Sequence, residues 1–509
     1  MLILSNSHGM STSRTPTIRT SQTHPLQIAT IPSGEGLASI GITFAPGKIQ
    51  PGAMTGAWHR DLATDLDAIA AWNAAAVVTL VESHELSALR IDAIGDEVRR
   101  RHMEWHHLPI RDYGVPDNAF MQAWPDTSER LRGLLRGGVR VLVHCKGGLG
   151  RAGSVAARLL VELGHPPDAA IALVRAHRPG AIETVEQERW VGQGRAVPED
   201  APQADRAATR DRAIGALVGL AVGDAIGTTL EFSRKPKHAA HFDMVGGGPF
   251  GLAPGEWTDD TAMALALADS LLASPHLDPA DLMGRFVSWW QAGTYSCTGS
   301  CFDIGITIRS ALGLFERSGD PIAGSTDPQT AGNGALMRLA PAAIRHWRDP
   351  AACAAVAALQ TRTTHGAAEA VDASILYASI LADAIAGRPR SAVLAPHAGR
   401  FAGGVQAIAS PEWRGRHRDA IRGSGYCVAA LDAALWAVSR TTDYRSAVLL
   451  AANLGEDADT TAAIAGQLAG ALYGLSGIPD TWLDRLAWRE RIEATADRLF
   501  AAGEANLIG

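Results

Sequence analysis

The sequence predicts two domains: an N-terminal α/β domain with a central sheet flanked by helices, and a C-terminal all-α domain. Three observations predict this division. The 509 residues exceed the length of an ordinary single domain. Short apolar runs alternate with helical stretches over 31–196, whereas long segments rich in alanine, leucine and glycine fill 211–509. Between them, segment 197–210 is polar and carries prolines, which is typical of a linker.

In the N-terminal domain, apolar and periodic segments alternate along the chain. Residues 1–30 are rich in serine, threonine and proline, so we expect a disordered tail there, and Met10 is an alternative start. The apolar runs predict buried strands at 74–82, 106–110 and 139–145. The periodic segments predict helices at 62–74, 126–138 and 151–164.

The C-terminal domain is expected to contain helices only. Apolar segments without strand character cover, among others, 212–227, 261–273, 370–387 and 460–474. Alanine and glycine are abundant and aromatic residues make up only 6%, which favours helices that approach closely through small side chains.

The charge and cysteine content narrow the class of protein. The 46 Lys+Arg and 53 Asp+Glu give a net charge of -7, which argues against general nucleic-acid binding. Five cysteines, an odd number in a long chain, are typical of a reducing compartment, and Cys297 and Cys301 are expected to be packing residues. Because apolar runs stay short of 18 residues, we expect a cytoplasmic protein without membrane contact.

The stretch VLVHCKGGLGRAGS at 141–154 allows more than one interpretation. Gly148, Gly150 and Gly153 spell a dinucleotide-binding fingerprint, which requires an acidic residue about 20 positions further on at the end of a second strand. Asp168 falls in a polar turn instead, and this disfavours a dinucleotide. A glycine turn with a purely structural role remains an alternative. The other interpretation is a phosphate cradle.

Cysteine-dependent cleavage of a phosphate monoester needs a thiolate, several donors for the phosphate oxygens and a proton donor for the leaving group. Cys145 ends an apolar run and Arg151 opens the following helix, so one loop can supply both a nucleophile and a bidentate cation. Backbone N–H groups of the intervening residues would bind the phosphate; the residues assigned to this cradle are Lys146, Gly147, Gly148 and Gly150.

Together with HHLPIRDYGVPD at 106–117 and VRAHRPGAIETVEQERW at 174–190, the loop resembles the dual-specificity branch of the cysteine phosphatases, particularly its kinase-associated members. The resemblance implies that Asp112 is the general acid, with Asp117 as the fallback. It also implies that Gln187 orients the hydrolytic water and that His144 supports the cysteine loop.

This family usually has serine or threonine directly after the arginine, and its hydroxyl stabilises the departing thiolate. Here that residue is Ala152, so a phosphate-binding domain with slow turnover is an alternative.

The second candidate site consists of two acidic helix starts, in GEWTDDTAMALALADSLL at 255–272 and NLGEDADTTAAIAGQLAGALYG at 453–474. Helix capping alone explains either start, but two clusters of oxygen ligands in one domain favour a hard cation such as Mg²⁺, Mn²⁺ or Ca²⁺ rather than zinc. An EF-hand is excluded, because Ala462 and Leu468 stand where that loop needs glycine and glutamate.

The blocks GALVGLAVGDAIGTTLEF, GEWTDDT, CFDIG, AGNGALMRLAPAA, RTTHG and GEDADTTAAIAGQLAGALYG resemble the ADP-ribosylglycohydrolase family, in the family's order. The resemblance implies an all-α fold with two Mg²⁺ or Mn²⁺ ions. The implied metal ligands are Thr258, Asp259, Asp260, Asp457, Asp459 and Thr460. The other implied site residues are Asp303 as the acid or base at the ribose, Glu231 near metal and ribose, and Asn333 and His365 along the cleft.

The two resemblances together predict a bifunctional hydrolase. Its substrates would be an ADP-ribosylated protein or small ADP-ribose conjugate, with an arginine linkage favoured, and a phosphorylated protein or small phosphate ester. We expect no cofactor in the N-terminal domain. The alternative is an N-terminal module that binds phosphorylated partners without catalysis and recruits them to an active glycohydrolase.

Overall fold

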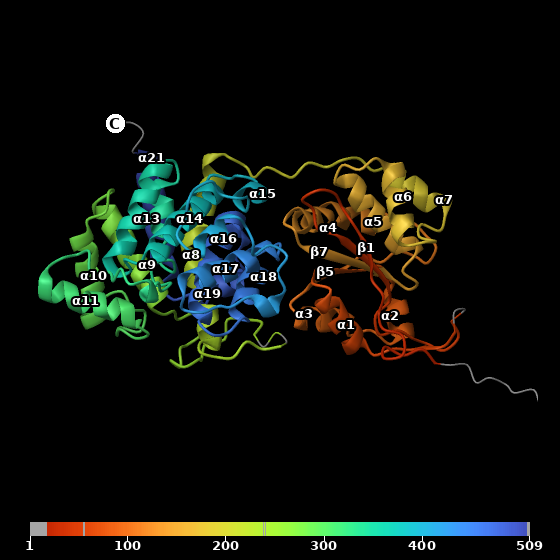
Figure 1. Ribbon diagram of the computed structural model, residues 1–509, viewed down its shortest axis with the longest axis horizontal. Coiled ribbons are helices and arrows are strands. Elements are labelled where there is room, and N and C mark those ends of the chain that lie inside the picture. The colour runs from red at the N-terminus through yellow and green to blue at the C-terminus, as the bar shows by residue number, and fades with distance from the viewer. Residues whose placement is uncertain (1–17, 54–55, 238, 240, 506–509) are drawn as a thin grey trace, which may run out of the picture.

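The computed structural model, which describes residues 18–53, 56–237, 239 and 241–505, consists of two domains joined by an extended segment (Figure 1). An α/β domain with a central sheet is followed by a helical domain, as the sequence predicts.

A mixed five-stranded sheet forms the centre of the N-terminal domain, in the order β1-β2-β7-β5-β6. The strands are β1 (Ala29–Ile31), β2 (Ile40–Phe44), β7 (Arg140–Cys145), β5 (Ala74–Thr79) and β6 (Glu104–His107). β1 pairs antiparallel with β2, and all other neighbours are parallel. A separate two-stranded ribbon contains β3 (Ile49–Gln50) and β4 (Trp58–His59). The three predicted strands correspond to β5, β6 and β7, although β6 begins and ends earlier than the run at 106–110.

Helices cover both faces of this sheet (Figure 1). On one face lie α1 (Leu62–Ala71), α2 (Ser83–Leu89) and α3 (Ile94–Arg100). On the other lie α4 (Asn118–Arg136), α5 (Gly150–Glu162), α6 (Pro167–His177) and α7 (Val185–Gly192). Consecutive residues of β7 alternate between the two cores: Val141 and Val143 pack under α5, whereas Leu142 packs under α1. Burial on both faces explains why this strand is apolar throughout.

The expected tail needs correction where the structure describes it. Residues 18–30 are ordered: the Gln27 carbonyl accepts a hydrogen bond from Thr43 Oγ1 at 2.9 Å, and β1 begins at Ala29. Pairing along the edge of β2 orders this polar segment, which carries no apolar periodicity of its own. Residues 1–17, the rest of that prediction, lie outside the described residues.

The linker ends earlier in the sequence than the predicted boundary at residue 210. Helix α8 (Arg206–Gly227) begins inside 197–210, because the Asp205 side chain accepts a hydrogen bond from Ala208 N at 3.0 Å and caps the helix. The remainder of the segment is extended and connects the domains (Figure 1).

The C-terminal domain is built from helices around α8. The others are α9 (Asp259–Ala273), α10 (Pro279–Ala292), α11 (Ile306–Ser318), α12 (Ala340–His346), α13 (Pro350–Thr364), α14 (Ala368–Ile385), α15 (Arg390–Val393), α16 (Val405–Ala409), α17 (Cys427–Ser439), α18 (Tyr444–Ala452), α19 (Ala458–Tyr473), α20 (Asp480–Leu483) and α21 (Arg489–Ala505). The segment Arg206–Leu230 is long and apolar enough to cross a membrane by length and composition, but 89% of its apolar window is buried inside the protein. α8 is therefore the central core helix of this domain.

Helices α8 and α19 touch backbone to backbone along a seam of small residues. Glycines recur every fourth residue on α8, at Gly215, Gly219, Gly223 and Gly227. They face, in the same order, Gly470, Gly466, Ala462 and Ala458 of α19. A Cβ atom on any of the four α8 glycines would lie 2.3–2.4 Å from a carbonyl oxygen of α19. The abundance of small residues thus produces the close approach that composition predicts.

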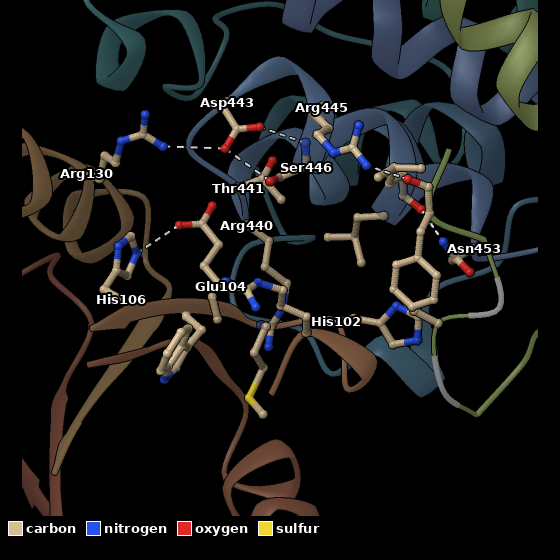
Figure 2. A pocket seen from close by; sticks show the side chains of 18 of the residues that line it. His102, Glu104, His106, Arg130, Arg440, Thr441, Asp443, Arg445, Ser446 and Asn453 are labelled. Carbon is tan, nitrogen blue, oxygen red and sulfur yellow. Dashed lines mark hydrogen bonds and ion pairs between the residues drawn. The ribbon is translucent and has the colours of Figure 1, made fainter. Parts of the chain in front are cut away.

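The two domains contact each other at the amino ends of β5 and β6 (Figure 2). The Arg440 guanidinium donates to Asn73 Oδ1 at 2.8 Å and to the Ala74 carbonyl. Thr442 N donates to Glu104 Oε1 at 2.8 Å. These contacts border a cavity of about 460 Å³ between the domains.

Candidate active sites

The first site is the loop between β7 and α5. Cys145 is the last residue of β7 and is buried, and its Sγ accepts a hydrogen bond from Gly148 N at 3.2 Å. Gly148 has a φ of 68°, and a Cβ there would lie 2.5 Å from the backbone carbon of Thr43. Glycine at this position therefore allows the loop to pass close to β2 and to direct an N–H toward the sulfur.

Arg151 is held rigidly above this loop, with only 2% of its surface exposed. Its Nη1 donates to Glu85 Oε2 at 2.6 Å and to the Ile110 carbonyl at 2.9 Å, while Nη2 lies 2.9 Å from Asp112 Oδ1. The structure thus brings the predicted cation and the predicted acid together.

Glu85 is a site residue that the sequence analysis missed. It belongs to the capping box of α2, a motif visible in the sequence VESHE, and its carboxylate also lies 3.8 Å from Lys146 Nζ. Burial alone would raise the pKa of Glu85, but hydrogen bonds from Arg151 and the backbone outweigh burial and hold the pKa below its usual range. Glu85 is therefore ionised and orients the two cations of the loop.

The two candidate acids have different places. The Asp112 side chain is 47% exposed and contacts Arg151. Asp117 caps α4, since its Oδ1 accepts from Phe120 N at 2.9 Å. Of the two candidate acids, only Asp112 thus borders the loop.

Gln187 lies next to the loop, but its side-chain amide forms hydrogen bonds with backbone groups. Its Nε2 donates to the Gly114 carbonyl at 3.1 Å, and its Oε1 accepts from Glu183 N at 2.8 Å. Glu183, which the sequence analysis also missed, accepts from Gly150 N at 2.8 Å. The Gly150 N–H of the predicted cradle is therefore engaged by a carboxylate from outside the loop, whereas a Cβ on Gly147 would meet open space.

His144, which precedes Cys145 on β7, and Ala152, which follows Arg151 on α5, are fully buried. His144 Nε2 is 2.8 Å from Thr79 Oγ1, and burial lowers the pKa of the imidazole to about 3, so the ring is neutral. The hydroxyl of Ser154 donates to the Gly150 carbonyl at 2.7 Å within its own helix. His144 accordingly supports the strand end under Cys145.

The second site forms where the N-termini of α9 and α19 meet. Asp259 and Asp260 occupy the first turn of α9, with Thr258 as its N-cap residue; Asp457 is the N-cap residue of α19, and Asp459 lies in its first turn. The two starts are in contact: Thr258 Oγ1 lies 3.3 Å from Asp260 Oδ2 and 3.5 Å from Asp459 Oδ2. Thr460 Oγ1 is 3.4 Å from Asp260 Oδ2. Four of the six predicted ligands are thus in contact, while Asp457 and Asp259 line the same cleft as Asp459 and Thr460.

Two groups of carboxylates have ligand atoms within 4.8 Å of one another, Asp224–Asp260–Asp459 and Glu231–Asp457–Asp459. Both groups contain Asp459. This arrangement fits two neighbouring cations that share one carboxylate.

Asp224, near the end of α8, was not predicted as a site residue. Its two carboxylate oxygens accept four hydrogen bonds of 2.7–3.0 Å from the backbone and hydroxyls of Thr258 and Thr261. It therefore fixes Thr258 more directly than it offers a free ligand atom. A lone acid in the apolar segment 212–227 is the sequence signal that could have identified it.

The carboxylates of this site are crowded and poorly solvated. Burial, and then repulsion from neighbouring carboxylates, raises the pKa values of Asp259, Asp260 and Asp459 well above the usual range. Asp260 Oδ1 is buried and has no hydrogen-bond partner among the described residues. An all-oxygen donor set with mutual repulsion and an orphaned oxygen fits a hard divalent cation.

A cleft of about 760 Å³ opens above these carboxylates. It is lined by Asp303, Asn333, His365 and Glu231, the four remaining predicted residues, together with Asp259, Asp457, Asp459 and Thr460. Asn333 Nδ2 donates to Asp457 Oδ2 at 2.9 Å, and Glu231 Oε2 accepts from Ala458 N at 2.6 Å. Burial lowers the pKa of His365 to about 3, so its ring is neutral.

Cys297 and Cys301 pack against the core of the helical domain, as expected. Burial raises the pKa of Cys297 to about 12 and that of Cys301 to about 11. Both remain thiols near neutral pH.

Comparison with known proteins assigns the helical domain to a family. Residues 205–507, more than half of the chain, match the family described as ADP-ribosylglycohydrolase. The chain belongs to the ADP-ribosylglycohydrolase family. It is 46% identical over 327 residues to ADP-ribosylarginine hydrolase Tri1 of Pseudomonas putida (strain GB-1), which covers 64% of this chain and 86% of that protein. A solved structure described as an ADP-ribosylglycohydrolase-related protein complex aligns at 40% identity and a TM-score of 0.52, covering 58% of this chain and 99% of that one.

The N-terminal domain has a different family. Residues 47–191 match the family described as Swiss Army Knife protein, DSP-PTPase phosphatase domain. Over 110 residues this part is 37% identical to cyclin-dependent kinase inhibitor 3 of Homo sapiens, which covers 21% of this chain and 50% of that protein. The ADP-ribosylglycohydrolase is therefore fused to a phosphatase-type domain, as the two resemblances predict.

Proposed function

We propose that this ADP-ribosylglycohydrolase is a bifunctional hydrolase. Its helical domain removes ADP-ribose from an acceptor with the help of two Mg²⁺ or Mn²⁺ ions, and the preferred acceptor is arginine. Its phosphatase domain hydrolyses phosphate monoesters through a phosphocysteine. The arginine preference rests on the similarity to an ADP-ribosylarginine hydrolase across most of that protein's length.

The observation that carries the first activity is the pair of carboxylate groups joined by Asp459 at the floor of the cleft. Thr258, Asp260, Asp459 and Thr460 would hold one ion, and Asp457 with Asp459 the second, while Asp259 faces the cleft from the first turn of α9. When bound, the ions would supply positive charge to ribose hydroxyl oxygens and to an attacking water.

The remaining residues of the cleft position the substrate and move a proton. Asp303 borders the cleft beside the metal ligands and would exchange a proton with the nitrogen or water at the ribose C1 atom. Asn333 holds the Asp457 carboxylate by a hydrogen bond, and His365, being neutral, offers a hydrogen bond without adding charge.

The metal proposal is tested by melting temperature as well as by activity. Mn²⁺ or Mg²⁺ added to chelator-treated protein should raise the melting temperature, because a ligand that binds only the folded state stabilises it by about 2.7 kcal/mol at 100 times its dissociation constant. Asp459→Asn should lose both this increase and ADP-ribose release from ADP-ribosylarginine. Asp484→Asn, at an exposed residue that does not line the cleft, is the control. ADP-ribose release that persists in chelator would overturn the proposal.

The observation that carries the second activity is the convergence of Cys145, the Gly148 N–H, Arg151 and Asp112 on one loop. Cys145 Sγ would attack the phosphorus while Asp112 gives its proton to the leaving oxygen, which yields phosphocysteine and the free alcohol. Water would then attack the phosphorus, release inorganic phosphate and return the thiolate. Arg151 and the loop N–H groups balance the charge of the phosphoryl oxygens in both steps.

Hydrolysis of an aryl phosphate tests this activity. The wild-type protein should release the phenol in the presence of chelator, and Cys145→Ser should abolish the release while leaving ADP-ribose release from ADP-ribosylarginine unchanged. If the wild type is no faster than Cys145→Ser, the domain binds phosphate without hydrolysing it, which is the recruitment alternative.

A further inference from the structure

The outer side of the phosphate loop is contacted by two cationic side chains. Lys48 Nζ donates to the carbonyl of Lys146 at 3.4 Å. The Arg178 guanidinium donates through Nη2 to the carbonyl of Gly147 at 3.3 Å and through Nε to that of Gly148 at 2.9 Å. Three consecutive carbonyls of the loop therefore each accept a hydrogen bond from a cation.

In a trans peptide unit, the C=O and the N–H of the next residue point in opposite directions. The carbonyls that face Lys48 and Arg178 consequently direct the following N–H groups to the inner side of the loop. Gly148 demonstrates this geometry, because its N–H donates to Cys145 Sγ while the carbonyl of the same peptide unit, on Gly147, faces Arg178. A cation at the carbonyl also polarises the unit and makes its N–H a stronger donor.

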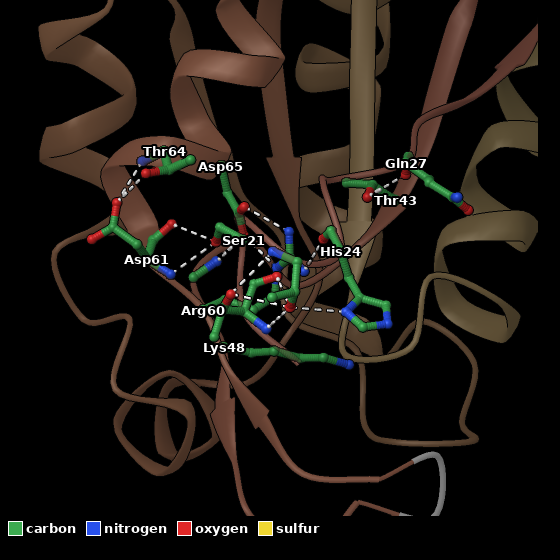
Figure 3. A network of polar contacts seen from close by, with 12 residues as sticks. Ser21, His24, Gln27, Thr43, Lys48, Arg60, Asp61, Thr64 and Asp65 are labelled. Carbon is green, nitrogen blue, oxygen red and sulfur yellow. Dashed lines mark hydrogen bonds and ion pairs between the residues drawn. The ribbon is translucent and has the colours of Figure 1, made fainter. Parts of the chain in front are cut away.

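Lys48 is held in place by aromatic rings, and it lies beside the ion pair of Arg60 and Asp65 (Figure 3). Its Nζ lies 4.7 Å from the ring centroid of Phe44 and 4.9 Å from that of Trp58, and only 6% of the residue is exposed. Preceding it, Gly47 N donates to Asp65 Oδ2, which also accepts from Arg60 Nε at 2.7 Å. Arg60 thus neutralises the Asp65 carboxylate and leaves the Lys48 charge directed at the loop.

The charged groups around Lys48 are mostly cations. Burial, followed by repulsion from Arg60, Lys146 and Arg178, lowers the pKa of Lys48 to about 8, while the interaction with the Cys145 side chain acts in the opposite direction. Nearby acids are engaged elsewhere, since Asp65 binds Arg60 and Glu85 binds Arg151. The ammonium is therefore charged below about pH 8 and loses its charge above it.

We infer that Lys48 and Arg178 are positioning residues of the phosphatase site. They hold the carbonyls of the loop outward, so that its N–H groups face Cys145 and the phosphate of the substrate, and their charges favour both the thiolate and a bound dianion. This inference rests on the proposed phosphatase function. It concerns the orientation of the loop and its binding of phosphate, and does not concern the rate of turnover.

Alkylation of Cys145 by iodoacetamide measures the thiolate without catalysis. Lys48→Met and Arg178→Met should each slow alkylation of the Cys145 peptide near pH 7, and should each raise the inorganic phosphate concentration needed to protect it, by about tenfold. Lys237→Met, at an exposed lysine that contacts Asp67, should match the wild type. Cys353 and Cys427 do not interfere, because burial raises the pKa of each to about 12.

The pH dependence separates an electrostatic role from a purely structural one. In the wild type, protection by phosphate should weaken as the pH rises through about 8, where Lys48 loses its proton. Lys48→Arg keeps its charge in this range, so its protection should weaken less, and Arg178→Lys should restore most of what Arg178→Met loses. These conservative variants keep the test valid if a methionine variant fails to fold.

Alkylation rates and phosphate protection that equal those of Lys237→Met in both methionine variants would overturn the inference. Coinciding pH profiles for the wild type and Lys48→Arg would overturn the electrostatic role of Lys48. An aryl phosphatase activity that survives in Cys145→Ser would overturn the proposed function instead. The alkylation rate and the protection by phosphate do not depend on that activity.

Discussion

At the residue scale, Ala152 is the residue on which turnover of the proposed phosphatase activity would depend. It is fully buried behind Arg151, and the nearest hydroxyl along the helix, on Ser154, donates to the Gly150 carbonyl. In the proposed mechanism, the thiolate that leaves in the second step would therefore receive no hydroxyl from residue 152.

Ala152→Ser should accelerate breakdown of the phosphocysteine. With an aryl phosphate, we expect the wild type to release a rapid burst of phenol followed by slow steady release, and the variant to increase the steady rate by about tenfold, a change of 1.4 kcal/mol in the barrier. Rapid mixing separates the two phases. Ala157→Ser, a buried change on the same helix, is the control. An unchanged steady rate would show that the missing hydroxyl does not limit turnover.

The sequence identifies site residues when the partners are close together in the chain. Cys145 and Arg151 share one loop, and each acidic helix start of the second site is a short motif. Glu85 contacts Arg151 across 66 positions, and Asp224 contacts Thr258 across 34. Those pairings depend on how the chain folds, and nothing local to either carboxylate specifies its partner.

At the element scale, the seam between α8 and α19 determines where the proposed metal ligands lie. The glycines allow the two backbones to touch, which brings Asp224 at one end of α8 next to the N-terminus of α19. A side chain in the seam would separate the helices and the carboxylates with them.

Gly466→Ala should destabilise the helical domain and weaken metal binding. A Cβ at Gly466 would lie 2.1 Å from the Gly219 carbonyl oxygen, and overpacking of this kind costs about 1–3 kcal/mol. We expect a lower melting temperature and a smaller increase on addition of Mn²⁺. In contrast, Gly284→Ala, on the exposed side of α10 with open space around it, should be neutral or stabilising by about 0.5–1 kcal/mol. Equal melting temperatures for the two variants would contradict this account of the seam.

Long elements with clear periodicity were predicted well, and short paired ones were not. β1 contains three residues, and β2 includes Gly41, where a Cβ would lie 2.8 Å from the Trp72 ring, so neither strand has a distinctive apolar run. Both exist because β7 offers a pairing edge, which is a property of the assembled sheet.

At the scale of the whole molecule, the domains are joined by buried polar contacts as well as by the connecting segment. Arg440 is the central contact, since its guanidinium reaches both Asn73 and Ala74 of the phosphatase domain. Burial lowers the pKa of Arg440 to about 10, so the side chain stays charged at neutral pH and these hydrogen bonds are charge-assisted.

Arg440→Met should loosen the docking of the domains without changing either active site. Hydrogen bonds to a charged group contribute about 1.5–3 kcal/mol each, so we expect the two domains to melt in separate transitions and the segment 193–205 to be cleaved faster by a protease. Calorimetry and limited proteolysis report these changes, with the exposed Arg400→Met as control. Rates of aryl phosphate and ADP-ribosylarginine hydrolysis should stay within about twofold of the wild type. A large loss of either activity would show that docking shapes that site.

The interface occupies the amino ends of β5 and β6, whereas Cys145 stands at the carboxyl end of β7. A six-residue strand is about 20 Å long, so the phosphate loop opens at the end of the sheet that faces away from the helical domain. In the proposed phosphatase activity, a product released at Cys145 would therefore leave at the end of the sheet that lies away from the domain interface. A partner that carries both modifications would have to present its phosphate at this end of the molecule, across the sheet from the side where the two domains meet.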